Sequence, residues 1–231
     1  IDRKKKLPIT TILFALGFSK EKIIETFYST NQYKYNEKKK NWSTQFDPDN
    51  YKRPIKLSYD LIDSSSDKKV LAKGEKLNIV IAKKLQEKGL KFISISNEEV
   101  IGKYIAKDIK NKNGEIIVGA GFDITEEQLY KIINQGEINL SIVNIDPINK
   151  GPYILETLKI DKNLSKSDAL NDIYKVLRPG EAPSIEIAEE IFNNLYFKKE
   201  RYDLSEVGRM KLNSKLNLSS SAKKTILETE D

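Results

Sequence analysis

Cationic side chains are the groups whose type and spacing suggest chemistry in this sequence. Residues 2–6 (DRKKK) form a basic cluster directly before a helical pattern. Lysine and arginine neutralise backbone phosphates and set a register without reading base sequence, so phosphate contact is the functional interpretation of this cluster. A solvated basic face is the structural interpretation, and the composition alone favours it.

Two other arginines stand at the borders of predicted helices. Arg178 is followed directly by Pro179-Gly180. An arginine at this place can satisfy the last carbonyl groups of its helix and interact with the helix dipole. Arg201 begins the segment RYDL, in which Asp203 is expected to cap a helix together with Glu206 three residues later.

The residue types that usually carry catalysis are missing or scattered. The sequence contains no histidine and no cysteine, which removes the commonest general base and the usual ligands of zinc, iron and copper. Its 34 carboxylates form no spaced cluster typical of a magnesium site. Gly119-Ala120-Gly121 lacks the lysine and hydroxyl of a phosphate loop and is interpreted as a turn. We therefore expect no catalysis and no cofactor in this chain alone.

Composition indicates a charged globular protein. The 231 residues include 39% hydrophobic and 32% charged residues, with a net charge of +6. No apolar run approaches the roughly 20 residues of a membrane span, so a cytoplasmic protein without a membrane contact is expected. The chain begins at Ile1 without methionine, and we expect it to be an internal piece of a longer polypeptide.

The two ends of the chain read as helical. Pro8 suits the start of a helix that Gly17 ends, and Ser19 is expected to cap a second one. After residue 151, three more helices are predicted, of which one ends at Pro179-Gly180 and one is capped by Ser184. The residues expected to face inward are Ile9, Ile12, Leu13, Leu16, Ile23, Ile24, Phe27, Leu170, Ile173, Tyr174, Leu177, Ile187, Ala188, Ile191, Phe192, Leu195, Val207 and Leu212. Residues after 217 read as a loop, or as a helix lacking its partners.

The middle of the chain, residues 28–150, has a different pattern. The polar segment 32–49 suggests a twisted hairpin or a mobile loop. Trp42 lies in this segment and is therefore not expected in the core. A partner contact or a hairpin aromatic is its expected role. Strands and two helices follow.

An internal repeat runs through this middle region at an offset of 121 − 74 = 47 residues. Each copy reads as a glycine turn, a helix, a glycine C-cap and a strand. The matched positions are Gly74, Leu77, Ala82, Leu85, Gly89, Ile93 and Ile95 in the first copy, and Gly121, Ile124, Leu129, Ile132, Gly136, Leu140 and Ile142 in the second. Two copies are too few for a solenoid, so they indicate two halves of one small domain.

The predicted fold is α+β, with a helical domain interrupted by an inserted α/β domain that contains the repeat. Residues 1–28 and 151–231 are assigned to the helical domain and residues 28–150 to the insertion. An inserted domain between two helical flanks is the simplest organisation that fits the pattern.

Five segments, read in order, resemble the second lobe of the bacterial DNA-directed RNA polymerase β subunit. They are residues 1–8 (IDRKKKLP), 15–17 (ALG), 151–158 (GPYILETL), 177–183 (LRPGEAP) and 201–211 (RYDLSEVGRMK). The last two motifs are highly specific together. The middle is similar, in residues 101–108 (IGKYIAKD) and 114–121 (GEIIVGAG), to the lineage-specific insertion of that lobe.

The resemblance implies a role in transcription. The lobe lines the DNA cleft of the polymerase and contacts the downstream duplex and the non-template strand. Matched motif positions assign DNA-facing roles to Asp2, Arg3 and Arg178, and neighbouring roles to Glu181 and Arg201. The implied partners are DNA and the α, β′ and sigma subunits in the nucleoid-associated enzyme. The catalytic magnesium is expected in the β′ subunit.

Two other functions remain open at this point. The insertion resembles a docking surface for secondary-channel regulators, so a protein–protein docking module is the main alternative. A basic stripe that joins Arg3, Arg178 and Arg201 would favour the DNA-facing lobe, and an apolar patch on residues 28–150 would favour docking. An independent enzyme is disfavoured because histidine and cysteine are absent.

Overall fold

The computed structural model describes residues 6–111, 113–134, 136, 139–145, 151–181, 184–228 and 231. Within it the chain divides into two compact units, each described here by itself. The helical unit is formed from Ile1–Ile23 and Ile160–Asp231, and the sheet unit from Ile24–Lys159. No helix in the described ranges is long and apolar enough to cross a bilayer. The fold is mixed α and β, which confirms the predicted α+β class.

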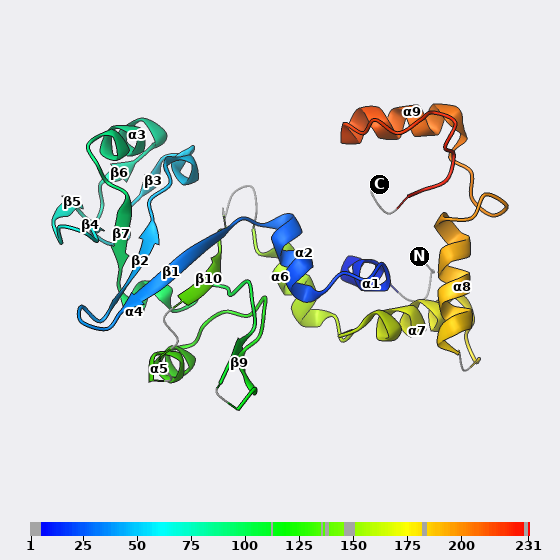
Figure 1. The fold of residues 1–231 in the computed structure, drawn as a ribbon, viewed down its shortest axis with the longest axis horizontal. Coiled ribbons are helices and arrows are strands. Elements are labelled where there is room, and N and C mark those ends of the chain that lie inside the picture. The colour runs from blue at the N-terminus through cyan, green and yellow to red at the C-terminus, as the bar shows by residue number, and fades with distance from the viewer. Residues whose placement is uncertain are drawn as a thin grey trace. The chain divides into compact units, whose positions relative to one another are not determined.

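The sheet unit contains an antiparallel sheet of six strands (Figure 1). In chain order its strands are β1 (Thr30–Asn36), β2 (Asn41–Gln45), β4 (Leu61–Asp63), β5 (Lys69–Leu71), β7 (Phe92–Ile95) and β10 (Asn139–Val143). Across the sheet they lie in the order β10-β1-β2-β7-β4-β5. Two short antiparallel ribbons accompany the sheet, namely β3 (Ile55–Lys56) with β6 (Lys76–Leu77) and β8 (Ile109–Lys110) with β9 (Ile116–Val118).

Short helices complete this unit and close its core. They are η1 (Pro48–Tyr51), α3 (Ile79–Glu87), α4 (Asn97–Val100) and α5 (Glu126–Asn134). Side chains of α3 and α5, such as Ala82, Leu129 and Ile132, are buried in one cluster with the inward residues of the strands. Helices α2 (Lys20–Phe27) and α6 (Tyr153–Ile160) contain the two points where the chain passes between the units.

The polar segment before residue 49 folds as a hairpin, which confirms one of its two interpretations. In this hairpin Tyr35 pairs with Trp42. The expectation that Trp42 lies outside the core is wrong, because its side chain is fully buried and its Nε1 donates a hydrogen bond to Asn97 Oδ1 (3.0 Å). Successive side chains of a strand point to opposite faces. Trp42 and Thr44 therefore face inward, while Ser43 between them faces outward.

The two segments of the predicted repeat share one order of elements. In the first, Gly74 precedes α3 and Gly89 follows it before β7; in the second, Gly121 precedes α5 and Gly136 follows it before β10. The two glycines that follow the helices have φ values of +102° and +77°, the left-handed conformation that ends a helix most easily at glycine. The strands occupy different places, since β7 lies inside the sheet and β10 lies beside β1. Superposition of the segments as equivalent copies stays a prediction.

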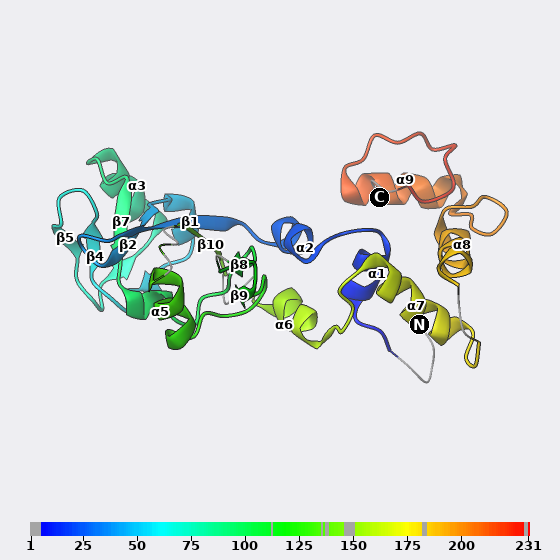
Figure 2. The same ribbon diagram turned by 60° about the horizontal axis from the view of Figure 1, so that its bottom comes forward.

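The helical unit contains α1 (Ile9–Ala15), α7 (Lys166–Leu177), α8 (Ile185–Tyr196) and α9 (Ser205–Leu216). α1 packs beside α7 (Figures 1 and 2). The predicted serine caps are present, because Ser19 Oγ accepts from Lys22 N (3.2 Å) and Ser184 Oγ accepts from Ile187 N (3.3 Å). The units divide within α2 and α6, whereas the sequence placed its boundaries at residues 28 and 150.

The predicted inward faces of the first two helices are partly wrong. Ile9 is 55% exposed and Phe27 is 41% exposed. Instead, α1 buries Thr10 and Thr11, whose hydroxyls donate to Asp161 Oδ2 at 2.5 and 3.1 Å. Hydroxyls can be buried when they have an acceptor, and this acceptor lies about 150 residues away in the chain. Apolar periodicity could not reveal it.

The predicted capping box at Asp203 is also wrong. α9 begins at Ser205, one residue later than such a box requires. Asp203 Oδ1 accepts from Ser205 N (2.8 Å), and Ser205 Oγ accepts from Gly208 N (3.3 Å). The serine therefore satisfies one free N–H group of the first turn, that of Gly208. Val207, which was expected to face inward, is 62% exposed.

Candidate nucleic-acid interface

The end of α7 positions the first candidate residue. Ser165 starts this helix, since its Oγ accepts from Asp168 N (3.2 Å). Arg178 ends it and donates its own N–H to Tyr174 O (2.8 Å). Pro179 follows directly, and proline lacks the N–H that the next helical hydrogen bond would need. Gly180 then turns the chain with a φ of +94°. Local chemistry thus places Arg178 at the exposed tip of a helix.

Arg178, Glu181 and Tyr174 meet at this tip. Arg178 Nη1 lies 3.8 Å from Glu181 Oε2, and Tyr174 Oη donates to the same oxygen at 2.7 Å. The carboxylate that accepts this bond, with a smaller contribution from burial, raises the pKa of Tyr174. The Arg178 and Glu181 side chains are 56% and 59% exposed, so the guanidinium is not buried against the carboxylate.

This geometry leaves Arg178 available to another anion. A surface ion pair at such a distance contributes little, because solvent screens it. Tyr174 holds Glu181 by the shorter contact and so fixes the carboxylate beside the arginine. A phosphate oxygen would offer a charge-assisted, bidentate partner in place of this loose contact.

Arg201 lies in a different place in the same unit. It belongs to a turn after α8, in which the N–H groups of Arg201 and Tyr202 donate to Lys198 O at 3.0 and 2.9 Å. Its side chain is exposed, and among the described residues it has no carboxylate oxygen within the 4.0 Å of an ion pair. Arg178 precedes α8 and Arg201 follows it. A helix of 12 residues spans about 18 Å, so the two arginines stand at opposite ends of α8.

Asp2 and Arg3 lie outside the described residues. Their convergence with Arg178 on one face therefore stays a prediction. Three of the predicted site residues are described. The structure brings Arg178 and Glu181 into contact, and α8 separates Arg201 from them. A DNA contact that uses both arginines must therefore follow an extended surface.

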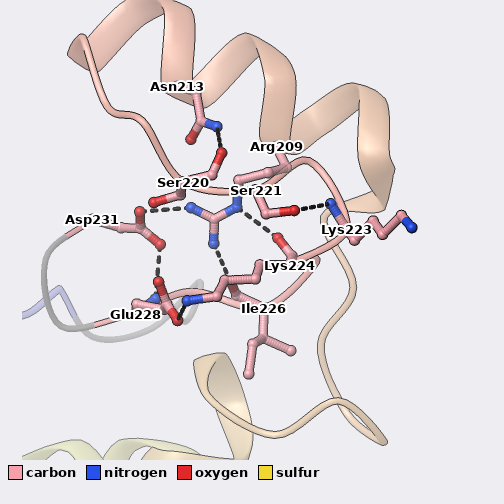
Figure 3. Close-up of polar contacts among 9 residues, drawn as sticks. All are labelled: Arg209, Asn213, Ser220, Ser221, Lys223, Lys224, Ile226, Glu228 and Asp231. Carbon is pink, nitrogen blue, oxygen red and sulfur yellow. Dashed lines mark hydrogen bonds and ion pairs between the residues drawn. The ribbon is translucent and has the colours of Figure 1, made fainter.

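Arg209 is an organising residue that sequence reasoning missed. Its side chain is fully buried, and its Nη1 forms an ion pair with Asp231 Oδ1 at 2.6 Å. Figure 3 shows its guanidinium enclosed by the C-terminal segment, where Nε donates to Lys224 O (2.7 Å) and Nη2 donates to Ile226 O. Hydrogen bonding to Asp231 raises the pKa of Arg209, and the same contact lowers the pKa of Asp231.

This cluster fixes the C-terminal segment against α9. Asn213 Nδ2 donates to Ser220 O (2.6 Å), and Glu228 N donates to Asp231 Oδ2 (2.8 Å) (Figure 3). Two backbone hydrogen bonds join the segment to both ends of the turn that carries Arg201. Leu204 N donates to Thr225 O, and Leu227 N donates to Tyr196 O. The only sequence signal was the position of Arg209 inside the motif 201–211, since its partner lies 22 residues away.

The described residues contain no group of three or more Asp or Glu that could hold a metal ion. The buried carboxylate of Asp161 is surrounded by the donors of Thr10, Thr11 and Asn163. The exposed arginines can bind an anion through their charge, whereas the buried polar clusters stabilise the fold.

Similarity to known proteins covers the whole chain. A family model, RNA polymerase Rpb2, domain 2, matches residues 131–231. The chain is 40% identical over 237 residues to DNA-directed RNA polymerase subunit beta of Caulobacter sp. (strain K31). The identity is 38% to that of Cereibacter sphaeroides (strain ATCC 17029 / ATH 2.4.9) and 41% to that of Rhizobium leguminosarum bv. trifolii (strain WSM2304). Each match includes 100% of this chain but only 17% or 18% of the relative.

Proposed function

We propose that this chain forms a lobe that faces DNA and takes no direct part in catalysis. The proposal rests on its membership of the β subunits of bacterial DNA-directed RNA polymerase, of which it is a segment. In this proposal the helical unit is the lobe and the sheet unit is its insertion. The lobe contacts the downstream duplex and the non-template strand of the opened DNA.

The activity of the parent enzyme is part of the proposal. It is DNA-dependent RNA synthesis, a nucleotidyl transfer carried out in the cytoplasm with the α, β′ and sigma subunits. The catalytic magnesium is assigned to the β′ subunit. The sequence supports a non-catalytic role for this segment, because it has no histidine and no cysteine.

The tip of α7 is the observation that carries the proposal. Arg178 is exposed beside a carboxylate that Tyr174 already holds, and it lies in the motif 177–183 that carries the resemblance. Phosphate contacts from arginine position DNA without reading its sequence, which suits a wall of a cleft. Arg201, Arg3 and Asp2 are proposed to extend this contact, with Glu181 as the neighbour that orients Arg178.

An Arg178→Ala variant of the assembled polymerase tests the proposal. Loss of one charge-assisted contact should weaken the open complex by about 1–3 kcal/mol. Its lifetime at low salt should therefore fall by about 5- to 150-fold, and the difference from wild type should shrink as salt rises. Elongation on a preformed nucleic-acid scaffold should change little, because the chemistry lies elsewhere.

Lys162→Ala is the control, because this residue is an exposed cation before the start of α7 and, among the described residues, has no carboxylate oxygen within the 4.0 Å of an ion pair. It should leave the lifetime of the open complex near that of wild type. An Arg178→Ala enzyme with an unchanged lifetime at low salt would reduce Arg178 to a residue that ends a helix.

A further inference from the structure

The positive charge of this chain is concentrated in one stretch of the sheet unit. Residues 52–91 contain eleven Lys or Arg and five Asp or Glu, which is a net charge of +6. The whole chain also has a net charge of +6, so the remainder is neutral on balance. None of the arginines proposed above to contact DNA lies in this stretch.

The fold gathers much of this charge on the ribbon of β3 and β6. Lys56 and Lys76 are directly opposite each other in its antiparallel register. Their neighbours Ile55 and Leu77 form the adjacent pair, and Leu77 is fully buried. Because successive residues alternate between faces, both lysines point away from the core. Like charges directly opposite each other destabilise a strand pair, and a bound anion would relieve this repulsion.

Three more cations adjoin this pair. Lys52 and Arg53 lead from η1 directly into β3. Lys73 lies just before β6, with its Nζ 5.9 Å from the centre of the Tyr59 ring. All five residues, Lys52, Arg53, Lys56, Lys73 and Lys76, are exposed and are called the basic ribbon from here on. In Figure 1 the ribbon strands lie at the same end of the sheet unit as α3, whose Lys83 and Lys84 are also exposed.

The nearby acidic groups have other partners. Asp60 forms an ion pair with Lys69 (2.8 Å) and accepts from the backbone N–H of Lys73 (2.6 Å). Asp63 accepts from Ser65 N (2.9 Å) and Ser66 Oγ (2.6 Å).

Two more carboxylates of residues 52–91 have other partners, and the fifth, Glu87, lies at the end of α3. Asp67 pairs with Lys39 (2.7 Å), and Glu75 accepts from Ala72 N (2.8 Å). In the part of the chain that the structure describes, no side chain of the basic ribbon has a carboxylate oxygen within the 4.0 Å of an ion pair. The cations of the ribbon therefore form no close ion pair among the described residues of the sheet unit.

We propose that the basic ribbon is a second DNA-binding surface, which holds the phosphate backbone of duplex DNA without reading its sequence. Duplex DNA carries one negative charge per ~1.7 Å of its axis, a density that suits cations crowded on adjacent strands. Single strands bind through series of stacking aromatic rings. Here the Tyr59 ring already lies under Lys73, so the surface offers charge rather than stacking. An acidic protein surface has a lower and less regular charge density than a duplex.

Binding of the 231-residue chain to a fluorescein-labelled duplex of 20 base pairs, followed by fluorescence anisotropy, tests this proposal. In the variant Lys56→Gln, Lys73→Gln, Lys76→Gln, the affinity at low salt should fall about tenfold or more. The slope of the logarithm of affinity against the logarithm of salt concentration should decrease by about 2 to 3, since each lost phosphate contact removes about 0.9.

The matched control is Lys34→Gln, Lys38→Gln, Lys110→Gln, which removes the same charge from exposed positions outside the ribbon. It should retain most of the affinity and nearly the full salt slope. Melting curves of both variants show whether they are folded. A second variant, Lys52→Gln with Arg53→Gln, changes only the segment that leads into β3 and should also weaken binding.

Three outcomes would overturn the proposal. The control variant could lose as much affinity as the ribbon variant, which would indicate a general effect of charge. The chain could prefer a polyglutamate peptide to DNA of equal charge, which would indicate an acidic protein partner. Finally, DNA binding could be lost in Arg178→Ala with Arg201→Ala but kept in the ribbon variants, which would leave only the lobe proposal standing. The reverse pattern would support the ribbon and contradict the lobe.

Discussion

Arginine has two opposite uses in the helical unit. Arg209 is fully buried and satisfied by Asp231 and by two backbone carbonyl groups. Arg178 is 56% exposed, and its ion pair with Glu181 is a loose contact of 3.8 Å. Burial of a guanidinium is tolerated only with close partners, because an unpaired buried charge costs several kcal/mol. The exposed arginine is therefore the one that remains available for a ligand.

The buried pair predicts a specific dependence of stability on pH. Arg209 lowers the pKa of Asp231, so the unfolded chain binds a proton there more readily than the folded chain does. The stabilisation is fully present above the unfolded value of about 3.9 and is lost as the pH falls through the lower folded pKa. Asp231→Asn should therefore lower the melting midpoint of the helical unit by about 5 °C at neutral pH.

Thermal unfolding followed by circular dichroism, at pH values from about 7 to 3, checks this prediction. The difference between wild type and Asp231→Asn should be constant above about pH 5 and should decrease at lower pH. Glu200→Gln, at an exposed position of the same unit, is the control and should melt like wild type. A variant difference that stays constant down to pH 3 would show that the pair does not supply the acid sensitivity.

Among the elements, α2 and α6 are joined by one buried hydroxyl. Tyr28, directly after α2, is 6% exposed. Its Oη donates to Gly151 O (2.8 Å) and accepts from Ile154 N (3.3 Å) at the start of α6. Burial raises the pKa of this tyrosine. The Tyr28 hydroxyl thus links the end of one helix to the start of another that lies more than a hundred residues away in the chain.

Tyr28→Phe should destabilise the sheet unit by about 1–2 kcal/mol, because a buried carbonyl and a partly buried N–H both lose their partner while the ring stays packed. Urea unfolding followed by tryptophan fluorescence of the buried Trp42 measures this change in the correct unit. Tyr130→Phe, at a position 56% exposed on α5, should have no comparable effect. Equal stability of wild type and Tyr28→Phe would mean that water replaces the hydroxyl.

For the molecule as a whole, the connection between the two units allows a clean excision. Thr30 in β1 is the register partner of Val143 in β10, and Asn144 N donates to Ser29 O at 2.9 Å. The chain thus enters the six-stranded sheet at residue 30 and leaves it at residue 143, and these two residues are neighbours across β1 and β10. A short glycine–serine linker can join Ser29 to Asn144, which removes residues 30–143 and keeps α2 and α6 with the helical unit.

This excision variant tests whether the helical unit is a domain in its own right. The unit should keep its helices and melt cooperatively within about 5 °C of its transition in the full chain, because a compact unit with its own core can fold alone. Helical content and melting measured by circular dichroism, with limited proteolysis, check this. Replacing Gly121 by Ala in the full chain is a useful comparison, since it strains only the sheet unit at a φ of +83°. Loss of cooperative melting on excision would contradict the division into a lobe and an insertion.

The sequence by itself determined the features that depend on a few neighbouring residues. Serine caps at Ser19 and Ser184, the end of α7 at Pro179 and the left-handed glycines after α3 and α5 all follow from local backbone chemistry. The α+β class and the position of Arg178 at a helix tip follow from the same signals.

Only the tertiary structure decided which polar or aromatic side chains are buried. Trp42 was expected outside the core because its neighbours in the chain are polar, and Thr10 and Arg209 are themselves polar. Each is buried against a partner that lies 55, 151 or 22 residues away. Burial of such a group is favourable only when that distant partner arrives with the right geometry. The sequence indicated Arg178 and Arg201 as candidate residues. Only the fold showed that α8 lies between them.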